Sequence, residues 1–191
     1  DRNGNIWIGT QGYGLRKINP AKQHFHKGAT GTSIWGLWRD AGGAYFCKVV
    51  YEVFPYDPVT GKIGSEHAFP DGPGRVLDVC MEPSGSYWLL GRGNEDNGMA
   101  ELRLCSPEHV LSRPYPFYFS SYTYARLLRN REGDIWITGA NCQLIRFHPP
   151  TGRFDYLDYA ALFGENANAV RAFALAEDGN GVLWIGTQQG L

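Results

Sequence analysis

The stretch Gly181-Val182-Leu183-Trp184-Ile185-Gly186-Thr187 decides the fold, because the chain repeats it. Close copies are Gly4-Asn5-Ile6-Trp7-Ile8-Gly9-Thr10 and Gly133-Asp134-Ile135-Trp136-Ile137-Thr138-Gly139. A looser copy is Gly85-Ser86-Tyr87-Trp88-Leu89-Leu90-Gly91, and the weakest is Gly42-Gly43-Ala44-Tyr45-Phe46-Cys47. Each copy places a glycine turn before an apolar strand that is centred on an aromatic residue. An internal repeat of this kind constrains every other inference about the chain.

The spacing of the repeat predicts the architecture. With Tyr45 taken as the residue in the tryptophan position, the central aromatic residues stand at 7, 45, 88, 136 and 184. An apolar strand such as 76–81 precedes each turn. After the aromatic strand come two further strands, such as 143–149 and 151–157. A period of about 40–50 residues with four short strands is typical of a β-propeller blade.

The sequence therefore predicts an all-β fold, a partial β-propeller. It would be an arc of about four four-stranded antiparallel blades from a larger ring, with 17 strands in all. The expected segments are a partial blade at 1–32, blades at 33–74, 75–121 and 122–168, and a partial blade at 169–191. Because a tryptophan strand stands at both ends, we expect an open arc with further blades on each side. Residues 159–163 are expected to form a helical turn between blades.

Composition excludes several classes of function. The formal net charge is -1, which leaves no electrostatic footprint for nucleic acid or anionic lipid. No stretch approaches the ~20 apolar residues of a membrane span, and the first residues lack a signal-peptide pattern. The four cysteines, Cys47, Cys80, Cys105 and Cys142, form no CxxC pair. Buried free thiols are favoured over disulfides, although four cysteines permit three pairings.

The repeated pattern resembles the two-component regulator propeller repeat, D-x-x-G-x-[IL]-W-I-G-T-x-x-G-L-x-[RK]-[IFY]-[DN]-P-x-T-G-x-F. Residues 1–25 and 178–191 fit it best, and 130–156 fit well. Residues 39–63 depart from it, with Arg39 in place of the acidic residue and Tyr45 in place of tryptophan. Residues 82–104 depart through an apparent insertion, Arg92 to Gly98.

This resemblance implies the setting and the function. Such repeats form seven-bladed propellers in the periplasmic part of hybrid two-component sensors, which are inner-membrane proteins of gut Bacteroidetes. The chain would be a ligand-sensing segment that recognises an oligosaccharide, contacts the remaining blades of its own chain and works as a homodimer. The segment itself would be non-catalytic, while the parent would carry a histidine kinase. A propeller polysaccharide lyase or hydrolase and a pure protein-interaction scaffold are the alternatives.

A candidate ligand site follows from residues that break the repeat. Tryptophans that recur in nearly every copy serve interblade packing. First strands line a propeller's channel, and there Arg75 and Arg171 share one position while Trp35, Asp78 and Arg126 share another. Guanidinium groups beside an aromatic platform would suit a sugar, particularly an acidic one. Alternatively, water and carbonyl groups satisfy these side chains within the channel.

A second departure is the aromatic run 115–124, which includes Tyr115, Phe117, Tyr122 and Tyr124. These residues are predicted to contact a ligand, a second propeller or a subunit, unless the run is simply a fourth strand and a connection.

No cofactor, metal or catalytic residue is expected. His24 and His26 supply only half of a metal site. The chain also lacks a G-x-S-x-G elbow and a phosphate-binding loop.

Overall fold

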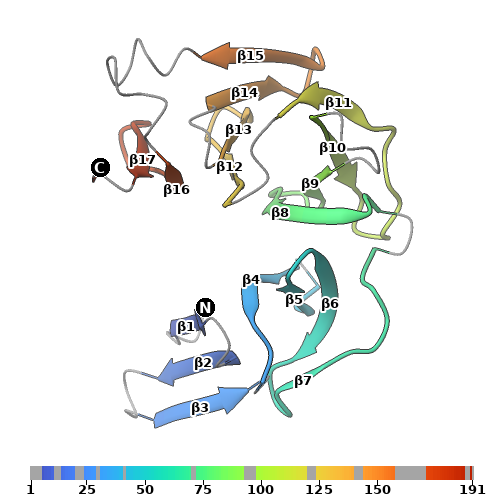
Figure 1. Ribbon diagram of the computed structural model, residues 1–191, viewed down its shortest axis with the longest axis vertical. Coiled ribbons are helices and arrows are strands. Elements are labelled where there is room, and N and C mark those ends of the chain that lie inside the picture. The colour runs from blue at the N-terminus through green and yellow to red at the C-terminus, as the bar shows by residue number, and fades with distance from the viewer. Residues whose placement is uncertain are drawn as a thin grey trace. The chain divides into compact units, whose positions relative to one another are not determined.

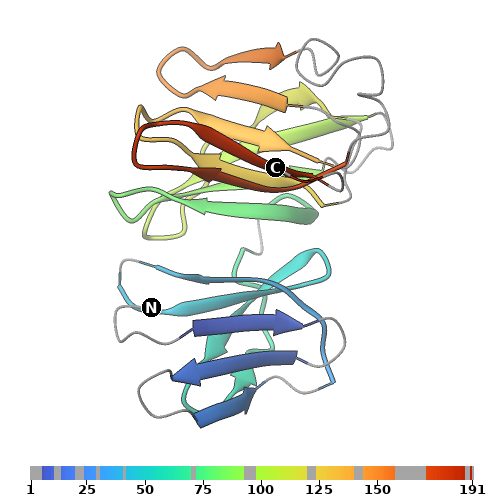
Figure 2. The same ribbon diagram turned by 90° about the vertical axis from the view of Figure 1, so that its left-hand side faces the viewer.

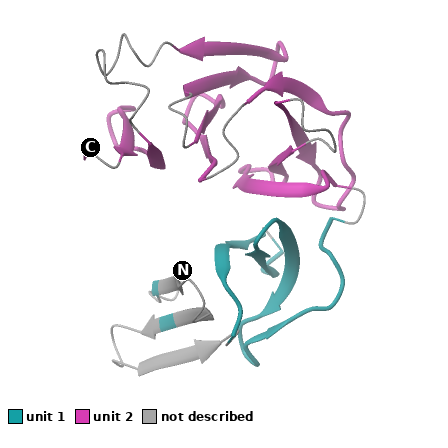
Figure 3. Cartoon of the chain, viewed as in Figure 1, with its two compact units in different colours: residues 1–71 teal, residues 72–191 magenta. Residues whose placement is uncertain are grey.

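The structure is a computed structural model that describes residues 6–10, 14–19, 24–28, 31–40, 42–69, 72–92, 98–119, 124–139, 144–157, 171–187 and 190. The chain divides into two compact units, residues 1–71 and 72–191 (Figure 3). The described residues form 17 strands and no helix, which confirms the all-β prediction. The helical turn expected at 159–163 lies outside them.

The first unit contains two antiparallel sheets in which each strand pairs with the next along the chain (Figure 1). The three-stranded sheet consists of β1 (Ile6–Thr10), β2 (Gly14–Asn19) and β3 (His24–Gly28). The four-stranded sheet consists of β4 (Ile34–Arg39), β5 (Tyr45–Val49), β6 (Glu52–Asp57) and β7 (Lys62–Ile63). Strand β1 lies against β4, so the two sheets meet along their first strands.

The second unit repeats this topology (Figures 1 and 2). One sheet has β8 (Arg75–Met81), β9 (Tyr87–Arg92), β10 (Met99–Cys105) and β11 (Tyr115–Tyr118). The next has β12 (Arg126–Arg129), β13 (Ile135–Thr138), β14 (Leu144–His148) and β15 (Arg153–Leu157). A hairpin of β16 (Ala172–Glu177) and β17 (Leu183–Thr187) follows. Strand β12 lies against both β8 and β16, so the first strands adjoin as the inner strands of successive propeller blades.

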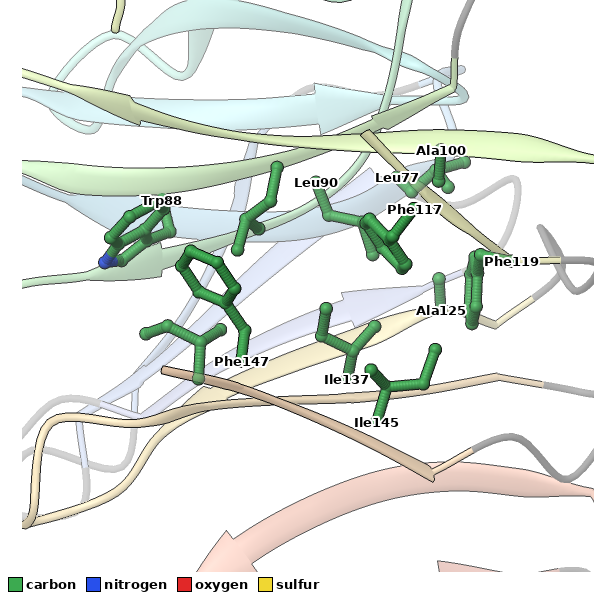
Figure 4. Close-up of a cluster of buried hydrophobic side chains, with 12 residues drawn as sticks. Leu77, Trp88, Leu90, Ala100, Phe117, Phe119, Ala125, Ile137, Ile145 and Phe147 are labelled. Atoms are coloured by element: carbon green, nitrogen blue, oxygen red, sulfur yellow. The ribbon is translucent and has the colours of Figure 1, made fainter. Parts of the chain in front are cut away.

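The core lies between the sheets rather than on one side of each. Residues 87–91 of β9 are all buried, on both faces of the strand. The largest apolar cluster joins Leu90 and Phe117 of one sheet to Ile137 and Phe147 of the next (Figure 4). Each such side chain contributes about 1.5–3 kcal/mol on burial. Stacking against a neighbouring sheet is therefore what stabilises a blade.

The repeated tryptophans take part in this stacking. Trp88 is 3% exposed, and its ring centroid lies 5.4 Å from that of Phe147 in the next sheet. Trp136 packs in a cluster that includes Leu175 and Ile185 of the hairpin. Trp184 is 46% exposed. The interblade role expected for the recurring tryptophan is thus confirmed at Trp88 and Trp136.

The turn between the first and second strands has one geometry in four sheets. After β8, Glu82 N donates to Ser86 O at 2.8 Å, and Gly85, with φ 90°, donates to Glu82 O at 3.0 Å. The corresponding turns run from Asp40 to Ala44, from Asn130 to Asp134 and from Asp178 to Val182. Glycine is needed at their positive-φ position, because other residues tolerate it poorly.

This geometry corrects the alignment of residues 39–63. The positive φ of 94° belongs to Gly43, and Gly43 N donates to Asp40 O. Gly43, not Gly42, is therefore the equivalent of Gly85, which puts Phe46, not Tyr45, in the tryptophan position. Asp40 retains the acidic residue of the repeat, so the prediction that Arg39 replaces it is wrong by one residue.

Three of the first strands share a bulge, and in β4 this bulge moves Trp35 out of its expected position. Their pairing shifts register between Ile34 and Gly36 in β4, between Val76 and Asp78 in β8, and between Ala172 and Ala174 in β16. Trp35, Leu77 and Phe173 are the extra residues of these bulges. Gly36, not Trp35, is thus the equivalent of Asp78 and Arg126.

The described cysteines are free thiols. Cys47 and Cys105 are buried and Cys80 is half-buried. Cys142 lies outside the described residues.

Candidate functional site

In the second unit the inner strands run in the same direction, as three contacts between neighbouring blades show. Leu127 N donates to Asp78 Oδ2 at 2.9 Å, which joins the middle of β12 to the middle of β8. Arg129 Nε lies 2.7 Å from Glu82 Oε2, and Arg131 N donates to Glu177 Oε2 at 2.9 Å. The ends of β8, β12 and β16 therefore coincide, whereas their starts do not, because the strands have 7, 4 and 6 residues.

The starts of these strands carry three arginines, which we call the starting edge: Arg75, Arg126 and Arg171. Arg75 begins β8, Arg126 begins β12 and Arg171 directly precedes β16. Arg75 and Arg171 are exposed, and Arg126 is half-buried with its Nη1 donating to Ala125 O at 3.0 Å. Counted back from the turn glycines, Arg75 and Arg171 occupy equivalent positions, and Arg126 lies three residues further along, level with Asp78. Three guanidinium groups in the first part of adjacent inner strands make this edge cationic.

Asp78 lies three residues after Arg75 in β8, and its side chain has a structural role. Its side chain is half-buried, and its Oδ2 accepts the hydrogen bond from Leu127 N that ties β8 to β12. The bond satisfies an amide on the side of β12 that faces the neighbouring blade. Asp78 thus positions the inner strands and places one negative charge near the three arginines.

Trp35, the remaining residue of the predicted site, belongs to the first unit. It stands on the bulge of β4, and 43% of its surface is exposed.

The described residues of the aromatic run 115–124 are divided between core and surface, with Phe117 and Phe119 buried and Tyr118 and Tyr124 exposed. Phe117 is 3% exposed and stacks on Phe154 of β15, with ring centroids 4.6 Å apart. Tyr115 packs against Phe147 at 5.0 Å. Tyr124 is 38% exposed and contacts Phe173 edge-on at 5.0 Å. Tyr122 lies outside the described residues.

The opposite ends of the inner strands enclose a cavity of about 420 Å³, which we call the turn cavity. It lies between the sheet β12–β15 and the hairpin β16–β17. Its lining residues come from two turns and their flanking strands: Asn130, Arg131, Glu132, Trp136, Arg146, Glu177, Gly179, Asn180, Gly181 and Leu183. The volume falls within the ~300–1,000 Å³ of small-molecule sites.

Ionic contacts fix the walls of the turn cavity. Arg131 Nη1 donates to Gly179 O at 2.6 Å, so one turn is tied to the other. The guanidinium carbon of Arg146 lies 5.8 Å from the centroid of the Trp136 ring. Arg146 Nε also donates to the buried Asp134 Oδ2 at 2.7 Å, which holds the guanidinium in place.

Asp134 also contacts a histidine, and a chain of polar contacts continues from it across the outer strands of this blade. His148 Nδ1 lies 2.7 Å from Asp134 Oδ1, and His148 Nε2 lies 3.6 Å from Asp155 Oδ2. Arg153 Nε donates to Asp155 Oδ1 at 2.8 Å. These contacts connect the residue before β13 to β14 and β15 and support the position of Arg146.

The sequence did not reveal the turn cavity. Arg131 and Gly179 are 48 residues apart along the chain, and the turn residues fit the repeat without departing from it. Only their meeting between two blades forms the cavity.

Two absences hold for the described part of the chain. It contains no cluster of three or more His, Cys, Asp or Glu side chains placed to hold a metal ion. It also contains no helix with the length and hydropathy to cross a membrane.

The fold and its repeated turns define a β-propeller segment. The family model for the two-component regulator propeller matches residues 164–189. The chain therefore carries a two-component regulator propeller repeat, which confirms the resemblance found in the sequence.

Solved structures with this fold differ in function. The extracellular domain of a putative hybrid two-component system from B. thetaiotaomicron matches with a TM-score of 0.68 and 19% identity, over 97% of this chain and 25% of that one. Virginiamycin B lyase from Staphylococcus aureus matches with a TM-score of 0.63 and 12% identity, over 100% of this chain and 66% of that one. At these identities the likeness shows the fold alone.

One curated relative is similar in sequence. The photosystem II assembly lipoprotein Ycf48 of Prochlorococcus marinus is 27% identical over 126 residues, which cover 59% of this chain and 35% of that protein. The chain thus spans about a third of that relative, and a quarter of the two-component extracellular domain.

Proposed function

We propose that this chain is a ligand-sensing segment in the periplasmic part of a hybrid two-component sensor. The propeller repeat at 164–189 and the likeness to an extracellular domain of such a system support this setting. The segment binds an oligosaccharide and carries out no chemistry, while a kinase elsewhere in the parent produces the signal.

The observation that carries the proposal is the starting edge. Arg75 and Arg126 begin two adjoining inner strands and Arg171 directly precedes the third, so three guanidinium groups stand in the first part of these strands. Guanidinium groups bind carboxylates and sulfates through paired, charge-assisted hydrogen bonds. The ligand is therefore an acidic oligosaccharide, such as one that contains uronic acid units.

Signalling requires more than binding. The ligand must bind one of two arrangements of a homodimer more tightly, because equal affinity for both would leave the equilibrium between them unchanged. The remaining blades of the parent and a second copy of the chain are the partners in this scheme.

Calorimetric titration of the full-length protein with tetragalacturonate tests the site. Saturable binding is expected, and Arg126→Ala and Arg171→Ala are each expected to weaken it by about 10-fold or more, the usual cost of a lost charged hydrogen bond. Arg113→Ala, an exposed arginine in the loop between β10 and β11, is the matched control. Unchanged affinity in both edge variants would remove the starting edge from the function.

The lyase relative makes catalysis the second candidate, since virginiamycin B lyase shares the fold. Incubation of the same oligosaccharide with the protein separates the two. Intact substrate after saturable binding supports a sensor, whereas shortened or unsaturated products would support a lyase or hydrolase.

A further inference from the structure

We propose that the turn cavity is a separate binding site for an uncharged sugar. It lies at the ends of β12 and β16 that are opposite the starting edge, because Asn130 follows β12 and Gly179 follows β16, whereas Arg126 and Arg171 stand at the starts of those strands. This site is independent of the proposed acidic-ligand site, so either can fail alone.

Charge balance determines the class of ligand. The two arginines of the turn cavity, Arg131 and Arg146, are matched by two glutamates, Glu132 and Glu177. Glu132 Oε2 lies 3.6 Å from Arg146 Nη2, and Glu177 Oε2 accepts from Arg131 N. Because the lining has as many glutamates as arginines and the buried Asp134 also pairs with Arg146, the cavity does not favour an anion. A neutral, polyhydroxylated ligand fits such a lining.

The lining also combines an aromatic ring with side-chain amides. Trp136 supplies apolar ring surface, on which the C–H face of a pyranose can pack. Asn180 presents an amide that makes no hydrogen bond to a described residue, while its backbone N–H donates to Asp178 Oδ1 at 2.8 Å. An amide can donate to one sugar hydroxyl and accept from another.

Asn130 stands on the other turn of the cavity, and its Oδ1 accepts from Asp134 N at 2.8 Å. Its NH₂ group is the remaining donor of that side chain. Hydrogen-bonding amides thus stand on both turns, with the tryptophan on the strand after the first of them.

The walls are organised before any ligand arrives. The bond from Arg131 Nη1 to Gly179 O joins the two turns, and Asp134 holds Arg146 beside Trp136. A ligand therefore gains contacts without ordering the turns, which is the condition under which a small cavity binds measurably.

Nuclear magnetic resonance of the full-length protein tests the proposal with cellobiose and maltose as probes. The indole N–H signal of Trp136, assigned from its loss in Trp136→Phe, is expected to shift saturably at millimolar sugar. Asn180→Ala is expected to weaken binding by about 2- to 10-fold through the loss of hydrogen bonds. Because only the backbone of Asn180 bonds to Asp178, this variant keeps the turn.

Ser84→Ala is the matched control, since Ser84 precedes the turn glycine of the β8–β9 turn as Asn180 precedes that of the β16–β17 turn. An unmoved Trp136 signal, or equal affinity in Asn180→Ala and the wild type, would overturn the proposal. A second result would also overturn the proposal: loss of neutral-sugar binding in Arg126→Ala with unchanged binding in Asn180→Ala. The sugar would then bind at the starting edge. Loss of tetragalacturonate binding in Arg126→Ala with retained cellobiose binding would support both sites.

Discussion

Glu82 Oε1 accepts a hydrogen bond of 2.6 Å from the indole Nε1 of Trp88, six residues later in the same blade. Its other oxygen, Oε2, lies 2.7 Å from Arg129 Nε of the next blade. One carboxylate thus fixes the repeated tryptophan and links two sheets. Asp178 makes the first of these contacts again, since its Oδ2 accepts from Trp184 Nε1 at 3.0 Å.

Glu82→Ala should lower the free energy of unfolding by about 2 kcal/mol, because the largely buried Trp88 indole and the half-buried Arg129 both lose a charged partner. Glu82→Gln should cost less, since its amide oxygen still accepts from the indole. Urea unfolding of each variant measures the difference. Glu66→Ala, in an exposed part of the first unit, is expected to change stability by less than about 0.5 kcal/mol. Equal losses of unfolding free energy in Glu66→Ala and Glu82→Ala would contradict the role given to Glu82.

The turn alignment can be checked at two adjacent glycines. Gly43→Ala is expected to cost about 1–3 kcal/mol, because φ is 94° and the new Cβ would lie 3.1 Å from Arg39 Nη2. Gly42→Ala should cost much less, since its Cβ would meet Asp40 Oδ1 at 3.4 Å, an ordinary contact. Thermal unfolding of both variants gives the comparison. A greater loss of stability in Gly42→Ala than in Gly43→Ala would instead indicate that Tyr45 occupies the tryptophan position.

Acid should weaken the β16–β17 turn through Asp178. Hydrogen bonds from the Trp184 indole, then from Val182 N and Asn180 N, hold the pKa of the Asp178 carboxyl below its ordinary value of 3.8. A depressed folded-state pKa stabilises the protein above the unfolded pKa of about 3.9. That contribution disappears as pH falls through the folded pKa.

The Asp178 carboxyl should therefore titrate below 3.8 by carbon-detected magnetic resonance. Asp178→Asn should flatten the fall in stability below about pH 4. A titration at or above 3.8 would show that the three hydrogen bonds do not favour the ionised form.

The thiols of Cys47 and Cys80 should react slowly in the folded protein. Burial raises the pKa of each to about 11, so little reactive thiolate exists near neutral pH. Because these folded pKa values are raised, the stabilisation is complete below the unfolded pKa of about 8.5 and is lost as pH rises to about 11.

Thiol titration with an aromatic disulfide at pH 8 measures this protection, with the urea-unfolded protein as the reactive reference. Cys47→Ala and Cys80→Ala identify each thiol by its missing signal. Rapid labelling of either cysteine in the folded chain would contradict its burial.

The turns show why prediction was partly successful. Gly85, Gly133 and Gly181 each stand alone before their aromatic strand, so spacing located them correctly. Gly42 and Gly43 are adjacent, as are Tyr45 and Phe46, so a shift of one residue fits the same pattern equally well. Only the backbone angle at Gly43 distinguishes the two alignments. The prediction that Trp35 shares a position with Asp78 and Arg126 was wrong because of the same one-residue shift.

The candidate sites were predictable to different degrees. Arg75, Arg126 and Arg171 stood out because they interrupt apolar first strands. The structure places Arg75 and Arg171 at equivalent positions and Arg126 three residues further along the neighbouring strand. The turn cavity had no such signal, because Trp136 and Asn180 belong to separate copies of a regular turn.

By itself, the sequence determined the strand pattern and the blade architecture, because a glycine turn and an alternation of apolar residues are local and recur about every 40–50 residues. The tertiary structure decided which side chains meet between blades: Asp78 with Leu127 N, Glu82 with Arg129, and Arg131 with Gly179. Those contacts join residues about 50 positions apart. They arise from the stacking of sheets whose apolar faces can only be buried against one another.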